Sequence, residues 1–303
     1  MQKLKVSKKY EGIKFSKFVD SYFLGKINRK DLFPMIRKKL IRLNNVHIKD
    51  INVVLKENDE LTFYLDDSYF TVSYKATLDI IYEDLNLLIV NKKAGVLSHG
   101  INNNHHSVLD EALTYLINKK EYDPKTNDFK PALCNRLDEF TSGLLIIAKN
   151  NGSAKETNRL IENNEIIKHY QAIVLGTFKV KANTLTDNYY FNEKLLKAEI
   201  NPSDKETKKV VTKYQVLKEK DNLTLLDIEL ITGRTHQIRA HLSYYSHPLL
   251  GDNKYGNKKI NDMYKKNHQI LTAYKLIFNV KNPESLLYYL NGKTVEINPN
   301  IIL

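Results

Sequence analysis

The sequence contains one cysteine, Cys134, in 303 residues, and it is poor in glycine and proline. A single thiol cannot form an internal disulfide or, by itself, a thiolate metal site, so the chain suits a reducing compartment. Eleven glycines and seven prolines exclude collagen-like and low-complexity classes. With 42% hydrophobic and 27% charged residues the composition is globular, and the length suits a small module joined to a larger domain.

Long apolar runs are also missing. The longest, such as residues 144–148 (LLIIA), are far shorter than the roughly 20 residues that span a bilayer. The basic start, MQKLKVSKKYEGIKF, is not followed by the apolar segment of a secretory signal. We therefore expect a cytoplasmic protein with no membrane partner.

The net charge of +12 is concentrated near the N-terminus. Residues 1–56 contain fifteen Lys or Arg and four acidic residues, so almost the whole excess lies there. A domain-sized basic cluster is typical of a protein that binds a polyanion, and nucleic acid is favoured over membrane because no amphipathic anchor accompanies it. A basic surface that is merely solvated is the alternative that charge alone leaves open.

Helical periodicity predicts two helices near the N-terminus, followed by two short β-like segments. The helices are expected at residues 15–23 and 29–40, and the strands at 40–43 and 60–65. Turns are expected at Asn44-Asn45 and Asn58-Asp59, because asparagine tolerates the left-handed backbone.

This stretch resembles an S4 RNA-binding domain, whose pattern is a basic second helix, V-x-V-N-G and a later G-D before a strand. Ile41, Leu43 and Asn44 stand at the V-x-V-N positions, and Asn58-Asp59 stands for Gly-Asp. The resemblance implies an S4-like domain over residues 1–70 whose basic side chains contact phosphates, giving affinity with little sequence discrimination. These side chains are Lys30, Arg37, Lys38, Lys39 and Arg42.

Residues 66–77 break the periodicity and predict a linker, and residues 71–303 form the larger domain. That domain shows neither an internal repeat nor strict strand–helix alternation, so we expect an α+β fold around a largely antiparallel or mixed central sheet with a cleft. Strands are expected at 80–82, 87–91, 144–148 and 170–175, helices at 107–119 and 155–163, and a turn at Asp84.

A polar turn at residues 135–143 (NRLDEFTSG) precedes an expected strand and can hold a carboxylate at the edge of a cleft. Asp138 alone could equally cap the turn. The whole segment, however, resembles the H-R-L-D-x-x-T-S-G signature of the RluA-like RNA pseudouridine synthases, with Asn135 in place of the usual His.

Residues 231–242 (ITGRTHQIRAHL) match the T-G-R-T-H-Q-I-R-x-H block of the same family, and its H-P-x-x-G-D block follows at residues 247–252. His236 and His241 are five residues apart. Two metal ligands on one face of a helix are usually four residues apart, so this spacing does not favour a metal site. We interpret both as structural histidines.

A third block, residues 168–176 (KHYQAIVLG), is similar to the family's K-x-Y-x-A-x-V-x-G strand and contains Tyr170, otherwise an ordinary aromatic strand residue. Residues 84–95 resemble the family's opening strands, with Lys93 where Pro is usual. The resemblance covers about residues 78–280. It implies an enzyme that isomerises selected uridines of structured RNA to pseudouridine, with no cofactor and no metal.

The resemblance assigns Asp138 the catalytic role, either as a nucleophile at the sugar C1′ or as a base. It indicates Arg234 as the cation that pairs with this carboxylate and keeps it charged. Tyr170 is expected to pack against uracil and assist removal of the C5 proton, and Arg136 to brace the RNA after base flipping. We expect a monomer acting on large-subunit ribosomal RNA, with transfer RNA as the alternative.

Two other functions remain open. A catalytically silent RNA-binding or ribosome-assembly factor could keep the fold, although retention of Asp138, Tyr170 and Arg234 argues against it. An RNA glycosidase could use the same carboxylate, and released uracil would identify it because isomerisation keeps the base attached.

Overall fold

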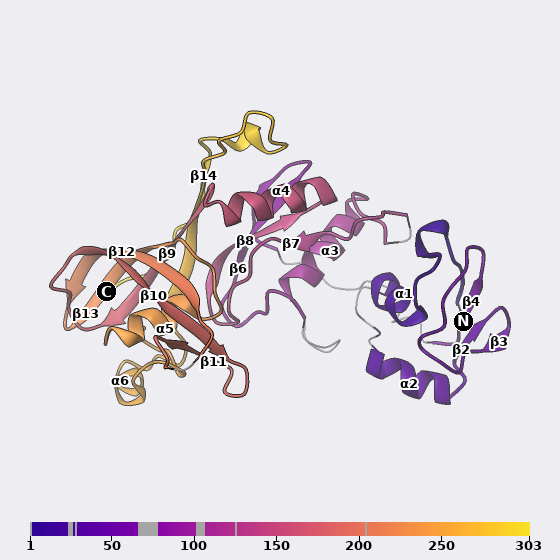
Figure 1. Ribbon diagram of the computed structural model, residues 1–303, viewed down its shortest axis with the longest axis horizontal. Coiled ribbons are helices and arrows are strands. Elements are labelled where there is room, and N and C mark those ends of the chain that lie inside the picture. The colour runs from indigo at the N-terminus through magenta and orange to yellow at the C-terminus, as the bar shows by residue number, and fades with distance from the viewer. Residues whose placement is uncertain are drawn as a thin grey trace. The chain divides into compact units, whose positions relative to one another are not determined.

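The computed structural model describes residues 2–23, 27, 29–65, 78–100, 107–124, 126–203 and 205–303. The chain divides into two compact units (Figure 1). Unit 1 comprises residues 1–78 and 99–132, and unit 2 comprises residues 79–98 and 133–303. The linker predicted at residues 66–77, and with it the domain boundary predicted after residue 70, lies outside the described residues.

Unit 1 contains a small antiparallel sheet in the order β1-β4-β2-β3, together with short helices. Its elements are β1 (Gln2–Lys5), η1 (Lys8–Tyr10), α1 (Phe15–Tyr22), α2 (Arg29–Arg37), β2 (Ile41–Leu43), β3 (Val46–His47), β4 (Glu60–Phe63) and α3 (Val108–Asn118). The two helices and two strands predicted near the N-terminus are confirmed. The edge strands β1 and β3 were missed because they are too short to show a period.

The two asparagine turns of unit 1 are confirmed and are joined to each other. Asn44, Asn45 and Asn58 all have positive φ, at 49°, 66° and 68°. The Asn44 side chain donates from Nδ2 to Asp59 Oδ1 (2.8 Å), and its Oδ1 accepts from the backbone N–H of Glu60 (2.8 Å). The side chain of Asn44, in the first turn, thus fixes the start of β4 at Glu60, directly after the second turn.

Unit 2 is built on one long twisted sheet in the order β11-β10-β12-β13-β9-β14-β8-β6-β5. The pairings are antiparallel except that β14 runs parallel to β8. The predicted α+β class with a largely antiparallel sheet is confirmed. The strands are β5 (Ile80–Glu83), β6 (Leu87–Lys92), β7 (Ala132–Leu133), β8 (Ser142–Ala148), β9 (Ile166–Leu175), β10 (Ala182–Asn192), β11 (Lys197–Ile200), β12 (Lys208–Lys220), β13 (Leu223–Leu230), β14 (Leu271–Phe278) and β15 (Thr294–Glu296).

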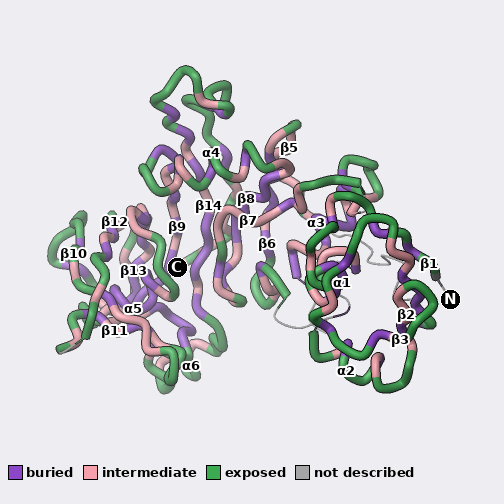
Figure 2. The backbone as a smooth tube through the Cα atoms, turned by 45° about the vertical axis from the view of Figure 1, so that its right-hand side comes forward, coloured by how far each residue is buried: buried purple, intermediate pink, exposed green. Residues whose placement is uncertain are grey.

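The middle of this sheet is the most buried part of unit 2. Leu144 to Ala148 of β8 are all buried, and Figure 2 shows β6 and β8 as mostly buried tube. The run LLIIA is apolar on both faces because both faces of β8 are covered. The helices of unit 2 are α4 (Asn151–Glu162), α5 (Gln237–Tyr244), α6 (Lys258–Met263) and the 3-10 turn η3 (Tyr288–Leu290).

Local side-chain caps set where two elements of unit 2 begin. Asn150 accepts from the backbone N–H of Ser153 (2.9 Å), so α4 starts earlier than periodicity predicted. Asp84 Oδ1 accepts from the backbone N–H groups of Asn86 and Leu87, both at 2.7 Å, which confirms the predicted turn between β5 and β6.

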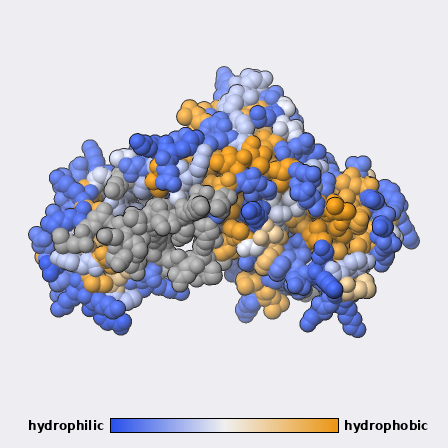
Figure 3. Space-filling model, turned by 180° about the vertical axis from the view of Figure 1, so that it is seen from behind, coloured by the Kyte–Doolittle hydropathy of each residue, from blue (hydrophilic) through white to orange (hydrophobic). Residues whose placement is uncertain are grey.

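The surface of the chain is mixed in polarity. On the face drawn in Figure 3, hydrophilic side chains dominate and hydrophobic ones are exposed in patches. Exposed apolar residues of unit 2 include Leu85, Leu195, Leu196 and Ile302. Across the described ranges, each helix is too short or too polar to span a bilayer.

Gly143 is required where β8 and β14 run parallel. Its φ is 114°, and a Cβ added there would lie 2.1 Å from the carbonyl oxygen of Ala273. We predict that Gly143→Ala lowers the free energy of unfolding by more than about 2 kcal/mol, because the backbone of β14 would have to move. Urea unfolding followed by circular dichroism measures this. Gly233→Ala is the matched control, since a Cβ there meets nothing within 4 Å; equal midpoints for the two variants would contradict the argument.

Candidate active site

Asp138 lies in the loop that leads into β8, and its side chain is 25% exposed. The backbone N–H of Thr141 donates to the Asp138 carbonyl oxygen (3.0 Å), closing a turn directly before the strand begins at Ser142. The polar turn predicted from residues 135–143 is therefore present. It holds a carboxylate that solvent and a ligand can reach.

The residue before Asp138 is held by a buried hydroxyl. Ser98 Oγ donates to the Leu137 carbonyl oxygen (2.8 Å) and accepts from the Leu137 backbone N–H (3.1 Å). Ser98 and Leu137 are both buried. Both backbone polar groups of Leu137 are thus satisfied by one side chain, which fixes the backbone on the N-terminal side of the carboxylate.

The residue after Asp138 is held by a buried ammonium. Lys92 Nζ, at the end of β6, donates to the carbonyl oxygen of Glu139 (2.7 Å) and to two carbonyls of residues 93–96. These three acceptors match the three donors of a lysine. Burial lowers the pKa of Lys92 to about 8, and the charges of Asp138 and Glu139 oppose that shift. Lys92 at the end of β6 and Ser98 in the segment after it therefore hold the backbone on both sides of Asp138.

Asn135, which stands where the family usually has His, ties the same loop to β8. Its Oδ1 accepts from the backbone N–H of Ile146 (2.8 Å), and its Nδ2 donates to the carbonyl oxygen of Leu144 (3.2 Å). The amide supplies one acceptor and one donor to two backbone groups of a buried strand. In this chain Asn135 therefore supports the Asp138 loop by joining it to β8.

Arg239 of α5 is the cation that pairs with Asp138. Its Nη1 donates to Asp138 Oδ2 (2.8 Å), while Nε and Nη2 donate to the two oxygens of Asp252 (2.7 and 3.0 Å). Arg239 and Asp252 are both buried. Burial by itself would raise the pKa of Asp252, but the hydrogen bonds and charge of Arg239 outweigh it and lower that pKa. One guanidinium thus serves two carboxylates.

The prediction that Arg234 pairs with Asp138 was wrong. Arg234 is exposed in the turn that precedes α5, where its backbone N–H donates to Gln237 Oε1 (3.1 Å). α5 begins only at Gln237, and its first six residues are all buried, so the next arginine of the block points inward. Asp252, a second carboxylate in the matched H-P-x-x-G-D block, was the signal that could have identified Arg239.

Tyr170 of β9 is buried and lies close enough to Asp138 to sense its charge. Burial, with a smaller contribution from Asp138, raises the pKa of the Tyr170 hydroxyl above its usual range. Lys168 is also buried and lies two residues earlier, on the same face of the strand. Burial lowers the pKa of Lys168 to about 8. The third sequence block therefore places its tyrosine within electrostatic range of the carboxylate.

The two histidines of the second block differ in their surroundings. His241 is fully buried, with Nε2 2.9 Å from Asp187 Oδ2 and Nδ1 2.9 Å from Thr212 Oγ1, as expected of a structural histidine. His236 has φ 56° at the start of α5, and its Nε2 lies 3.9 Å from Asp138 Oδ2. Sequence reasoning missed this proximity. Among the described residues, no group of three or more His, Cys, Asp or Glu could hold a metal ion.

The residues predicted to contact RNA are placed on two units. Arg136 is exposed in the Asp138 loop of unit 2. The basic residues predicted for the S4-like domain belong to unit 1; of these, Lys30, Arg37, Lys38 and Lys39 are exposed on or just after α2. The Arg42 guanidinium lies 5.2 Å from the centre of the Tyr64 ring.

The double ion pair predicts unequal effects for two arginines of one block. Arg239→Gln should lower the free energy of unfolding by about 3–5 kcal/mol, because Asp252 would be left buried without its cation. Arg234→Gln, at an exposed position, should change it by less than about 0.5 kcal/mol. Thermal and urea unfolding of both variants measure the difference. Similar losses in the two variants would show that Arg239 does not carry this role.

Comparison with known proteins finds a match to the RNA pseudouridylate synthase family over residues 86–244. A Mycoplasma capricolum protein named as an uncharacterized RNA pseudouridine synthase is 35% identical over 283 residues, or 89% of each chain. A ribosomal large subunit pseudouridine synthase C of Rickettsia conorii is 36% identical over 221 residues, covering 72% of this chain and 69% of that protein. Among solved structures, human RNA Pseudouridylate Synthase Domain Containing 1 shares the fold, with a TM-score of 0.55 and 23% identity over 74% of this chain and 91% of that chain.

The matched residues include all three blocks from which the family was predicted, at 135–143, 168–176 and 231–242. The long relative extends the similarity over most of the chain. The chain therefore belongs to the RNA pseudouridylate synthase family, the enzymes that isomerise uridine in RNA to pseudouridine.

Proposed function

We propose that this pseudouridine synthase modifies large-subunit ribosomal RNA and that Asp138 is its catalytic carboxylate. The observation that carries the proposal is the pairing of a partly exposed Asp138 with a buried Arg239 beside a buried Tyr170. The name of the Rickettsia conorii relative supports the choice of ribosomal RNA. The expected monomeric state and cytoplasmic location stay predictions.

The reaction requires a carboxylate that remains charged when a base covers it. Uridine becomes pseudouridine when the bond between N1 and C1′ breaks, the uracil turns, and C5 joins C1′ with loss of the C5 proton. Arg239 binds Asp138 Oδ2, whereas no described residue donates a hydrogen bond to Oδ1. A guanidinium fixed on one oxygen orients the carboxylate and leaves the other oxygen for the sugar, as nucleophile or as base.

Tyr170 contributes its ring and a neutral hydroxyl in this proposal. Because burial and Asp138 raise the pKa of Tyr170, the phenol stays protonated at neutral pH and cannot by itself act as a general base. Its aromatic face can pack against the detached uracil while that base turns. The C5 proton would then leave through Tyr170 only together with transfer of the phenolic proton to a neighbour such as Asp138.

Arg136 and the basic surface of α2 would hold the RNA at different points. Arg136 lies two residues from Asp138 on the same loop and is exposed, so it can fill the space of a flipped uridine. The exposed side chains of Arg37, Lys38 and Lys39 lie at or just after the end of α2 and suit phosphates of an RNA duplex or loop. We infer that this part of unit 1 acts as the S4-like RNA-binding module.

The catalytic role of Asp138 predicts that Asp138→Asn abolishes turnover and leaves RNA affinity within about twofold, since Asn keeps the size of the side chain but cannot attack or accept a proton as a carboxylate does. Tritium release from C5-labelled uridine in ribosomal and transfer RNA transcripts measures turnover. Glu139→Gln, the adjacent exposed acid, is the control and should retain activity.

Each alternative has its own signature in that assay. Free uracil without pseudouridine would identify a glycosidase. Intact RNA binding without tritium release from the wild type would favour a silent binding factor. Near-normal release from Asp138→Asn would remove the carboxylate from the mechanism.

If the end of α2 binds RNA phosphates, removing its charges should weaken RNA binding and leave the rate of the chemical step unchanged. Arg37→Gln combined with Lys38→Gln should weaken binding at low salt and make the slope of log K against log salt concentration shallower by about 1 to 2, as expected when one or two phosphate contacts are lost. Filter binding at several KCl concentrations measures the slope, and turnover at saturating RNA should be unchanged. An unaltered slope would show that the end of α2 does not contact RNA.

A further inference from the structure

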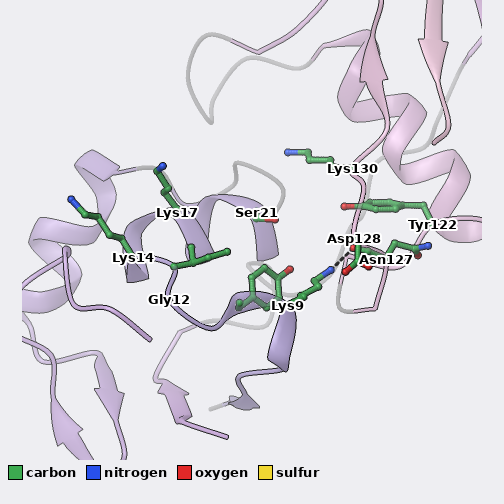
Figure 4. A pocket seen from close by; sticks show the side chains of 11 residues that line it. Lys9, Gly12, Lys14, Lys17, Ser21, Tyr122, Asn127, Asp128 and Lys130 are labelled. Carbon is green, nitrogen blue, oxygen red and sulfur yellow. Dashed lines mark hydrogen bonds between the residues drawn. The ribbon is translucent and has the colours of Figure 1, made fainter. Parts of the chain in front are cut away.

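Unit 1 contains an open cavity of about 750 Å³, lined by both charged and apolar groups, that none of the assignments above uses. One wall comes from residues 9–21, which contain the start of α1, and the other comes from residues 122–130, which follow α3 (Figure 4). The two walls are separated by about a hundred residues of sequence but belong to the same compact unit. Lysines and residues that carry a hydroxyl group contribute seven of its eleven lining residues.

Hydrogen bonds between the two walls give the cavity a fixed floor. Lys9 Nζ donates to the carbonyl oxygens of Pro124 (3.2 Å) and Asn127, and the Tyr10 hydroxyl donates to the same Pro124 oxygen (2.8 Å). Burial lowers the pKa of Lys9, while the nearby charges of Asp128 and Asp123 oppose that shift. The hydrogen-bond acceptors of the Lys9 ammonium are neutral backbone carbonyls. Lys9 therefore contributes a positive charge to the cavity.

Three further lysines give the cavity its charge. Lys14 and Lys17 rise from one wall and Lys130 extends from the other, as Figure 4 shows. Within the described part of the chain, none of these three forms an ion pair with a carboxylate. Asp128 is the one acidic side chain of the described lining. Four cations against one anion make a site that attracts a polyanion.

We propose that this cavity binds the sugar–phosphate backbone of the RNA substrate, as a contact separate from the end of α2. Lysine is a compact charge that binds phosphate without reading sequence, and the hydroxyls of Ser21 and Tyr122 can donate to phosphate or ribose oxygens. The volume exceeds that of a phosphate group and accommodates a nucleotide-sized segment. The inference rests on RNA being the substrate of this chain and extends the proposed function.

The test replaces the three free lysines in the full chain, as Lys14→Gln, Lys17→Gln and Lys130→Gln. A matched control removes the same charge from exposed positions of unit 1 outside the cavity, as Lys5→Gln, Lys49→Gln and Lys56→Gln. Binding of a large-subunit ribosomal RNA transcript is measured by filter retention across KCl concentrations. The cavity variant should lose about two phosphate contacts, so its slope of log K against log salt concentration should be shallower than that of the control by about 2.

A change of opposite sign separates a binding site from a damaged fold. Asp128→Asn removes the acidic lining residue and should tighten RNA binding, whereas Glu57→Gln, an exposed acid of unit 1 outside the cavity, should have a smaller effect. Urea midpoints of all variants establish that they are folded. Equal slopes for the cavity and control variants, with no gain from Asp128→Asn, would overturn the proposal and would leave another anionic partner to be sought.

Tritium release from the same variants keeps this proposal apart from the proposed function. The cavity variant should reach half-maximal release only at a higher RNA concentration than the wild type, and its release should still depend on Asp138, which belongs to unit 2. If the wild type releases no tritium but its salt-dependence slope still differs from that of the cavity variant, only the catalytic proposal is contradicted. Asp138-dependent release with equal slopes would sink the cavity proposal alone.

Discussion

Arg239 is the residue on which the active site depends. Burying a guanidinium is costly because it loses its contact with water, and it is stable here because each of its three nitrogens donates a hydrogen bond to one of two carboxylates. Asp252 in turn accepts from the backbone N–H groups of Lys254 and Tyr255. The ion pair therefore connects α5, the Asp138 loop and the turn after residue 247 through a single side chain. Three motifs that are separate in the sequence meet because each supplies one part of this charge network.

The carboxylate is held more firmly than its partial exposure suggests. Ser98 and Lys92 satisfy backbone groups on either side of Asp138, and Asn135 anchors the loop to β8. This explains how the chain tolerates two departures from the family pattern. Asn135 still makes hydrogen bonds to the strand, and exposed Lys93 needs to supply only its carbonyl oxygen, which accepts from Lys92. At both positions the residue present in this chain makes a hydrogen bond that holds the Asp138 loop or the segment beside it.

The basic N-terminal region is more than a uniformly charged surface. Its cations fall into at least two groups in unit 1, one at the end of α2 and one around the cavity between residues 9–21 and 122–130. The second group exists because a segment following α3 packs against the start of the chain through Lys9 and Tyr10. Residues 99–132 thus lie within the sequence of the synthase domain but belong to the compact unit of the N-terminal domain. Each compact unit is therefore built from two separate stretches of the sequence, and a single boundary in the sequence does not separate them.

The sequence alone determined the features that depend on neighbours in the chain. Periodicity and asparagine turns predicted four of the α-helices and six of the strands that the structure describes. Three contiguous blocks predicted the family, because residues at fixed spacing impose local geometry wherever they occur. Only the tertiary structure decided which arginine meets Asp138. Arg234 and Arg239 lie five positions apart in one block, and the choice depends on where α5 starts and which side of it is buried. The contact that settles it spans 101 positions, and the one that joins Tyr10 to Pro124 spans 114. Such contacts are fixed by packing and burial of the whole chain, which no local pattern encodes.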